Sequence, residues 1–148
     1  MSKPQPPAVE PKYDPSRPFP EIQLLYKKPI VNCPGMTIVA LRVSFPPNGS
    51  TPPHTHAGAF LVGNVISGFT LDKMNDGPMV IHGPGDSFSE NPGCRHRIND
   101  NASATEPAVV VATMILETKV VEEVGIEGLV VIDEEYRAMV EEAQGGKR

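Results

Sequence analysis

The sequence predicts an all-β domain of antiparallel strands with one helix at its C-terminal end. Two observations favour this fold class. Short apolar segments recur between turn sequences rich in Gly, Pro, Asn and Asp, which is typical of antiparallel sandwiches and barrels. No helical spacing of apolar residues interrupts these segments, so a doubly wound α/β fold is not expected.

Composition limits the kinds of protein that the chain can be. Its 148 residues suit one domain, and its net charge of -5 comes without any extended basic cluster. A cationic face for nucleic acid is therefore not expected. No apolar run approaches the roughly 20 residues of a membrane span, and the first 20 residues lack a signal-peptide pattern. We expect a cytoplasmic protein that binds neither nucleic acid nor membrane.

The predicted elements divide the chain into three parts. Residues 1–20 are rich in proline and are expected to form a flexible N-terminal arm. Residues 21–132 are expected to form the barrel, and residues 133–148 a C-terminal helix and tail. The clearest strand is 36–45, where apolar side chains alternate. The other predicted strands are 21–26, 51–56, 60–66, 69–74, 79–82, 87–90, 94–98 and 108–117.

Three of the four histidines lie in a pattern that favours a metal site. His54 and His56 are two residues apart, so on a strand both rings lie on one face. His96 follows about 40 residues later at the start of another predicted strand. Imidazole binds zinc, iron, manganese, nickel and copper, and three such ligands leave a coordination position open. On spacing alone, exposed or half-buried histidines without a metal are the more frequent outcome.

Two motifs reduce the weight of that alternative. The first motif reads Gly49-Ser50-Thr51-Pro52-Pro53-His54-Thr55-His56 and ends at Gly68. The second reads Gly85-Asp86-Ser87-Phe88-Ser89-Glu90-Asn91-Pro92-Gly93-Cys94-Arg95-His96, with Asn99 or Asn101 after it. Together they resemble the two motifs of the cupin superfamily, and the resemblance covers about residues 36 to 118. The match is not complete, because the first spacing is one residue short and the proline of the second is displaced by one.

The resemblance implies a double-stranded β-helix, or jelly roll, with one divalent metal ion on His54, His56 and His96. More narrowly, the stretch from Asn101 to Ala108 is similar to small single-domain cupins of fungal and bacterial biosynthetic clusters. The identity of the metal (Zn, Fe, Mn, Ni or Cu) stays open. Barrels of this kind also need cover for their sheets, and residues 22–25 offer a strand that can pair with a neighbouring barrel. We therefore expect a homodimer.

One departure from the family pattern concerns the carboxylate ligand. Phe60 or Leu61 stands where the family usually supplies a glutamate. Glu90 is the predicted substitute, because it is in phase with Phe88 on a strand and close in sequence to His96. Asp72 alternates with Leu71 and is expected to face outward. Glu90 is predicted to be a metal ligand or, with a pKa raised by partial burial, an acid–base group; the alternative is a solvated strand end.

These residues suggest a small-molecule enzyme. The predicted substrate-binding residues share an apolar barrel interior, and they are Phe60, Val62, Asn64, Phe88 and Met114. A divalent ion there would polarise a carbonyl, and proton transfer beside it gives isomerisation, cyclisation, dehydration or decarboxylation. The first hypothesis is a non-redox enzyme acting on a biosynthetic, possibly polyketide-derived intermediate. The alternatives are an iron-dependent dioxygenase and a non-catalytic small-molecule binding module, because a fold alone does not determine function.

Overall fold

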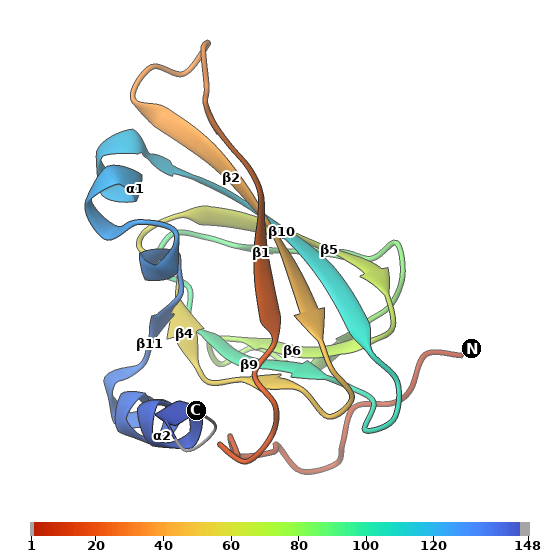
Figure 1. The fold of residues 1–148 in the computed structure, drawn as a ribbon. Coiled ribbons are helices and arrows are strands. Elements are labelled where there is room, and N and C mark those ends of the chain that lie inside the picture. The colour runs from red at the N-terminus through yellow and green to blue at the C-terminus, as the bar shows by residue number, and fades with distance from the viewer. Residues whose placement is uncertain (1, 146–148) are drawn as a thin grey trace.

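The computed structural model describes residues 2–145 and contains two antiparallel sheets that face each other (Figure 1). Sheet A has the strand order β1-β2-β10-β5-β8, and sheet B has the order β11-β4-β9-β6-β7, with β3 also pairing with β9. The predicted all-β fold with a C-terminal helix is confirmed. The elements are β1 (Glu21–Pro29), β2 (Met36–Phe45), β3 (Ser50–Thr51), β4 (His54–Thr55), β5 (Phe60–Ser67), β6 (Thr70–Met74), β7 (Val80–His82), β8 (Ser87–Glu90), β9 (His96–Asn101), β10 (Ala108–Glu117), α1 (Thr118–Val124), the 3-10 helix η1 (Glu127–Leu129), β11 (Val131–Ile132) and α2 (Glu134–Gly145).

The centre of sheet A is the long antiparallel pair β2 and β10. The ten residues of β2 pair in continuous register with the ten residues of β10, from Met36↔Glu117 to Phe45↔Ala108. Alternate side chains of both strands are buried, as the period of two in the sequence predicts. This face of sheet A supplies the main apolar core, which includes Val39, Leu41 and Met114.

Sheet B changes its side-chain alternation at a β-bulge. Lys73 pairs with Ile98 and Met74 pairs with His96, which leaves Arg97 as the extra residue of β9. A bulge inserts one residue, so the side chains on either side of it no longer alternate regularly. As a result, His96 and Asn99 both line the space between the sheets, although they are three residues apart.

The outer side of sheet B carries its own small apolar cluster, formed by Leu71, Ile81 and Ile98. The N-terminal arm runs past β6 and β9 on its way to β1 (Figure 1). Ion pairs hold the arm to this sheet, with Glu10 3.0 Å from Lys73 and 2.8 Å from Arg97. We expect these contacts to limit the flexibility that the proline content predicts.

The segment after β10 contains elements that the sequence pattern did not reveal. Residues 118–124 include several valines and resemble a strand, yet they form helix α1, with Val121 packed into the core. Gly125 ends the helix with a positive φ of 71°, a conformation that glycine adopts without strain. Within residues 2–145, no helix has the length and apolar character that crossing a membrane requires.

Candidate metal centre

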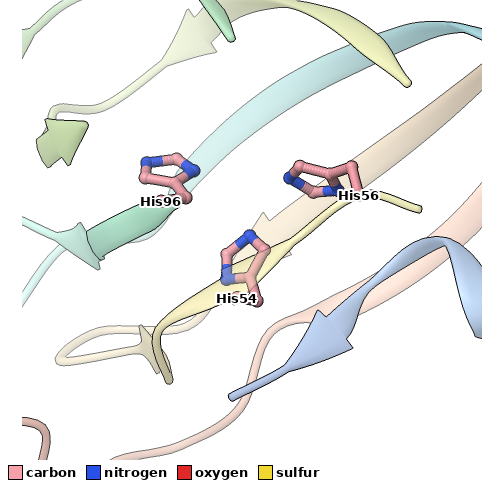
Figure 2. Close-up of side chains that lie close together, drawn as sticks. All are labelled: His54, His56 and His96. Carbon is pink, nitrogen blue, oxygen red and sulfur yellow. The ribbon is translucent and has the colours of Figure 1, made fainter. Parts of the chain in front are cut away.

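The three predicted histidines converge between the sheets (Figure 2). His54 on β4 lies directly opposite His96 on β9, and His56 follows β4. One ring nitrogen from each of the three lies within 4.8 Å of the other two. All three side chains are buried, with relative exposures of 1, 8 and 2% for His54, His56 and His96.

A separate acceptor orients each ring. His54 Nδ1 donates to the carbonyl oxygen of Pro52 at 2.8 Å, and His56 Nδ1 donates to that of Leu129 at 3.0 Å. His96 Nε2 donates to Asp72 Oδ1 at 2.9 Å. In the neutral form of each ring, the proton lies on the nitrogen that makes this bond, so the other nitrogen offers its lone pair to a ligand. The free set is therefore Nε2 of His54, Nε2 of His56 and Nδ1 of His96.

Glu90 completes the cluster from the other sheet. Its Oε2 lies 3.4 Å from His56 Nε2 and 3.3 Å from His96 Nδ1, without hydrogen-bond geometry. Glu90 pairs across the strands with Leu61, so β8 places a carboxylate beside the β5 position where the family pattern expects one. The predicted solvated strand end is excluded, because Glu90 is 2% exposed.

The cluster contains a strong separation of charge. Burial disfavours the ionised form of Glu90, but His56 and His96 outweigh burial and hold the pKa of Glu90 well below its usual range. The expected rise in the pKa of Glu90 is therefore wrong, because facing imidazoles replace the lost solvent. Burial also lowers the pKa of His96, but Asp72 and Glu90 overcome it and raise this pKa to about 9. Burial, together with His56 and His96, lowers the pKa of His54 to about 3.

The donor set fits a divalent ion. His56 Nε2 and both oxygens of Glu90 are buried without a hydrogen-bond partner among the residues described. Buried polar atoms rarely stay unpaired, so such a group calls for a ligand. Imidazole nitrogens are donors that zinc, iron and related ions accept, and His54, His56 and His96 could hold the ion, with the Glu90 carboxylate close to His56 and His96.

Asp72 does not face outward as the alternation with Leu71 predicted. It is 2% exposed, and its oxygens accept hydrogen bonds from Thr70 Oγ1 at 2.6 Å, His82 Nδ1 at 2.8 Å and His96. The prediction is wrong because Leu71 packs into the outer cluster of sheet B, which leaves Asp72 on the inner side. Thr70 and Asp72 are polar and two residues apart, like His54 and His56. This spacing was the sequence feature that could have indicated a polar inner face on this strand.

The apolar part of the site differs from the prediction on one strand. Phe88 and Met114 line the cavity as expected. Phe60, Val62 and Asn64 do not, so that part of the prediction is wrong; Phe60 and Asn64 are exposed. A Cβ atom at Gly63 would lie 2.3 Å from Phe88 Cζ. Gly63 therefore faces the interior, and Leu61 faces inward with it.

The cavity around this cluster is narrow and mostly apolar. The volume that the centre of a water molecule can occupy is about 40 Å³. Sheet A lines it with Leu41, Val43, Phe45, Leu61, Phe88, Glu90, Val110, Ala112 and Met114, and β3, β4 and β9 add Thr51, His54, His96 and Asn99. Thr51 and the carbonyl of Leu129 could not be predicted as parts of the site, because nothing in the sequence shows which backbone or hydroxyl groups lie there.

Solved structures share this architecture. A conserved Klebsiella pneumoniae protein with a double-stranded β-helix domain has a TM-score of 0.56 at 19% identity, over 68% of this chain and 79% of that one. The cupin domain of Schizosaccharomyces pombe Cnp3 has a TM-score of 0.55 at 16% identity, over 71 and 66%. Oxalate oxidase in complex with the substrate analogue glycolate has a TM-score of 0.53 at 20% identity, over 93 and 74%.

Curated proteins give no sequence match. The family comparison is specific: residues 41–114 match the model described as the cupin domain, and this range holds half of the chain and all four groups of the histidine–glutamate cluster. The predicted double-stranded β-helix and the two motifs agree with that match. The chain therefore belongs to the cupin family.

Proposed function

We propose that this protein is a cytoplasmic, metal-dependent enzyme that moves a proton on a small oxygenated biosynthetic intermediate, without redox chemistry. The observation that carries the proposal is Glu90, a buried carboxylate whose oxygens lack a hydrogen bond and which faces His56 and His96. Perturbed, buried titratable groups in an apolar cavity are typical of catalytic sites.

The residues divide the chemistry between them. His54, His56 and His96 would hold a divalent ion, which supplies Lewis acidity toward a carbonyl oxygen. Glu90 is the carboxylate that lines the same cavity, and it would accept a proton from the carbon next to the carbonyl. Leu61 and Met114 exclude water from this step. Return of the proton to another carbon gives isomerisation. Transfer of the proton to a β-hydroxyl group, which then leaves as water, gives dehydration.

The cavity volume bears on the substrate. A space of about 40 Å³ for the centres of water-sized groups favours a substrate of few atoms. Among the biosynthetic intermediates that the sequence resemblance suggests, we therefore favour small ones over full-length polyketides. Glu90 supplies a carboxylate beside the position where the family's usual glutamate is missing, which favours an enzyme over a non-catalytic binding module.

Metal analysis and isotope exchange test the proposal together. Purified protein is loaded with Zn²⁺, and butan-2-one in D₂O is followed by proton NMR for deuterium uptake next to the carbonyl. We expect one ion per chain and exchange above the protein-free rate, with Glu90→Gln losing most of the exchange. Oxygen consumption by iron-loaded protein would instead support a dioxygenase. Binding of small ketones by metal-free protein with no exchange in either form would support a binding module.

We also propose that two copies of the chain associate. β1 is the edge strand of sheet A, and all nine of its residues are exposed. Leu24 and Leu25 on this strand are 45 and 44% exposed. Proteins usually protect the edge of a sheet from pairing with another chain, so exposed leucines on an open edge strand favour association. We expect light scattering at micromolar concentration to give a dimer, and Leu24→Lys to give a monomer. A monomeric wild-type protein would contradict this proposal.

A further inference from the structure

One hydroxyl group in the cavity has no partner. Thr51 is 5% exposed, lines the cavity between the sheets, and its Oγ1 makes no hydrogen bond with any residue in the described range 2–145. A buried hydroxyl without a partner destabilises the free protein. A group that costs stability in the free protein is expected where a ligand supplies the missing hydrogen bond.

The local structure holds Thr51 firmly in that orientation. The neighbouring Ser50 points to the opposite side of β3, where its hydroxyl bonds to Asp100 Oδ1 and Asp100 forms an ion pair with Arg17 at 3.0 Å. The Ser50 amide also donates to the carbonyl of Pro18 at 2.9 Å. Because successive side chains of a strand point to opposite faces, this network fixes Thr51 toward the cavity.

Thr51 has a polar neighbour across the strands. It pairs in register with Asn99 on β9, and both residues line the cavity. Asn99 is three residues from His96 along β9, and with the bulge between them the separation along the strand is roughly 7 Å at about 3.3 Å per residue. The cavity therefore has two polar ends, the histidine–glutamate cluster and the pair of Thr51 and Asn99, with apolar side chains such as Phe45 and Val110 along sheet A.

The far end is polar but carries no charge. Among the cavity-lining residues in the described part of the chain, none is Lys or Arg. A carboxylate or phosphate placed beside Thr51 would lose its hydration without gaining a cation, which is strongly unfavourable. A neutral oxygen would exchange its hydrogen bond to water for one to the Thr51 hydroxyl.

From this arrangement we propose that Thr51 is a specificity-determining residue that binds a neutral hydroxyl or carbonyl oxygen at the far end of the substrate. The inference rests on the proposed metal-dependent function and names its substrate class. The substrate has one oxygen function at the histidine cluster, a short apolar segment, and an uncharged oxygen at Thr51. Dicarboxylates and phosphorylated compounds are excluded.

The test uses three small hydroxamates of similar length, which differ at the end away from the metal-binding group. They are 4-hydroxybutanohydroxamic acid, pentanohydroxamic acid and succinic monohydroxamic acid. Binding to Zn²⁺-loaded protein is measured by calorimetry. We expect the hydroxyl probe to bind about three to ten times more tightly than the methyl probe, the range for one net hydrogen bond. The carboxylate probe should bind more weakly than both.

Thr51→Val removes the hydroxyl with little change in shape. We expect this variant to lose the preference for the hydroxyl probe, to keep its Zn²⁺ content, and to melt a few degrees higher than wild type when free of ligand, roughly 2–5 °C. Thr51→Ser retains a hydroxyl and should therefore prefer the hydroxyl probe, as wild type does. Thr37→Val is the matched control, because Thr37 is also 5% exposed but its hydroxyl bonds to Thr118 Oγ1 at 2.7 Å. The control should lose stability and keep the wild-type preference.

The experiment distinguishes failure of the proposed metal site from failure of the role of Thr51. Wild-type protein that retains no Zn²⁺ would overturn the proposed metal site and the substrate class with it. Protein that retains Zn²⁺ and binds the hydroxyl and methyl probes equally, in wild type and Thr51→Val alike, would overturn the role of Thr51 alone. A lower melting temperature for Thr51→Val would also count against that role, since it would show that the hydroxyl has a structural partner.

Discussion

Sheet A and sheet B contribute opposite kinds of side chain to the cavity between them. The inner face of sheet A is apolar, with Leu41 and Met114 buried there and Glu90 as its charged exception. The inner face of sheet B is polar, with His96 and Asp72 buried there, while its apolar residues pack on the outer side. The difference shows that the inner face of sheet A stabilises the fold, whereas the inner face of sheet B holds the histidine cluster. Burying polar groups there lowers stability, and the apolar cluster on the outer side of sheet B helps to offset that loss.

Removal of a histidine from the polar face should have the largest effect. His54→Ala deletes one of three converging nitrogens, and we expect metal affinity to fall by about 100-fold or more, beyond the loss typical of outer partners. Elemental analysis after dialysis against a defined zinc buffer measures the change. Unchanged zinc content would show that the histidines do not form a metal site.

Asp72→Asn should have the next largest effect, although Asp72 is outside the proposed ligand set. The substitution removes the charge that orients His96, and we expect a loss of about 10–100-fold in metal affinity. Asp100→Asn is the matched control, because Asp100 is also a buried carboxylate on sheet B but bonds to Ser50 and Arg17. If both variants bind zinc equally well, the bond from Asp72 does not tune the site.

The stability of the metal-free protein should peak near pH 6.5. The pKa of His96 is raised to about 9 from its ordinary 6.5, because the two carboxylates outweigh burial, so its stabilising contribution is lost as pH rises from 6.5 to 9. Burial and the neighbouring imidazoles lower the pKa of His54 to about 3, so stability also falls as pH drops from 6.5 toward 3. Urea unfolding at several pH values measures this profile.

Bound metal should change the alkaline side of that profile. A metal ion requires His96 without the proton that metal-free protein holds, so metal affinity should rise between pH 6.5 and 9. Metal-loaded protein should therefore lose less stability than metal-free protein across this range. Parallel profiles for the two forms would contradict the assignment of His96 as a ligand.

The smallest effect on the metal is expected from the apolar face. Met114 is fully buried in the core of sheet A, and Met114→Ala should lower the free energy of unfolding by about 2–5 kcal/mol. Its zinc affinity should stay within about threefold of wild type, because no ligand moves. A large loss of zinc in this variant, with the fold intact by circular dichroism, would show that the two faces are not independent.

The difference between the two sheets also explains which side-chain directions could be predicted from the sequence. On sheet A, alternation in residues 36–45 predicted the strand, because burial there follows hydrophobicity. On sheet B, the apolar Leu71 packs outward with Ile81 and Ile98, so hydrophobicity assigned Asp72 to the wrong side. On β5, Gly63 leaves room for the ring of Phe88, and this inversion of the expected face cannot be inferred from alternation.

The histidines and Glu90 were predictable for a different reason. The spacing of the three histidines within two motifs identified them as candidates, and the strand phase that Glu90 shares with Phe88 added Glu90. The structure brings these side chains together. The groups that orient the rings were not predictable. Two of the three are backbone carbonyls, of Pro52 and Leu129. Every residue type has the same carbonyl oxygen, so the residue type does not reveal this role.

That choice of acceptors has a consequence for how the protein tolerates mutation. No substitution at Leu129 deletes the carbonyl that holds His56, so a mutational scan of side chains would pass over this contact unless the change displaces the chain itself. Asp72, by contrast, can be lost through one altered side chain. Variation at residue 129 is therefore expected to be limited only by packing, because Leu129 is fully buried in the core, whereas residue 72 should also have to keep its carboxylate. Insertions or deletions between β10 and β11 should be poorly tolerated.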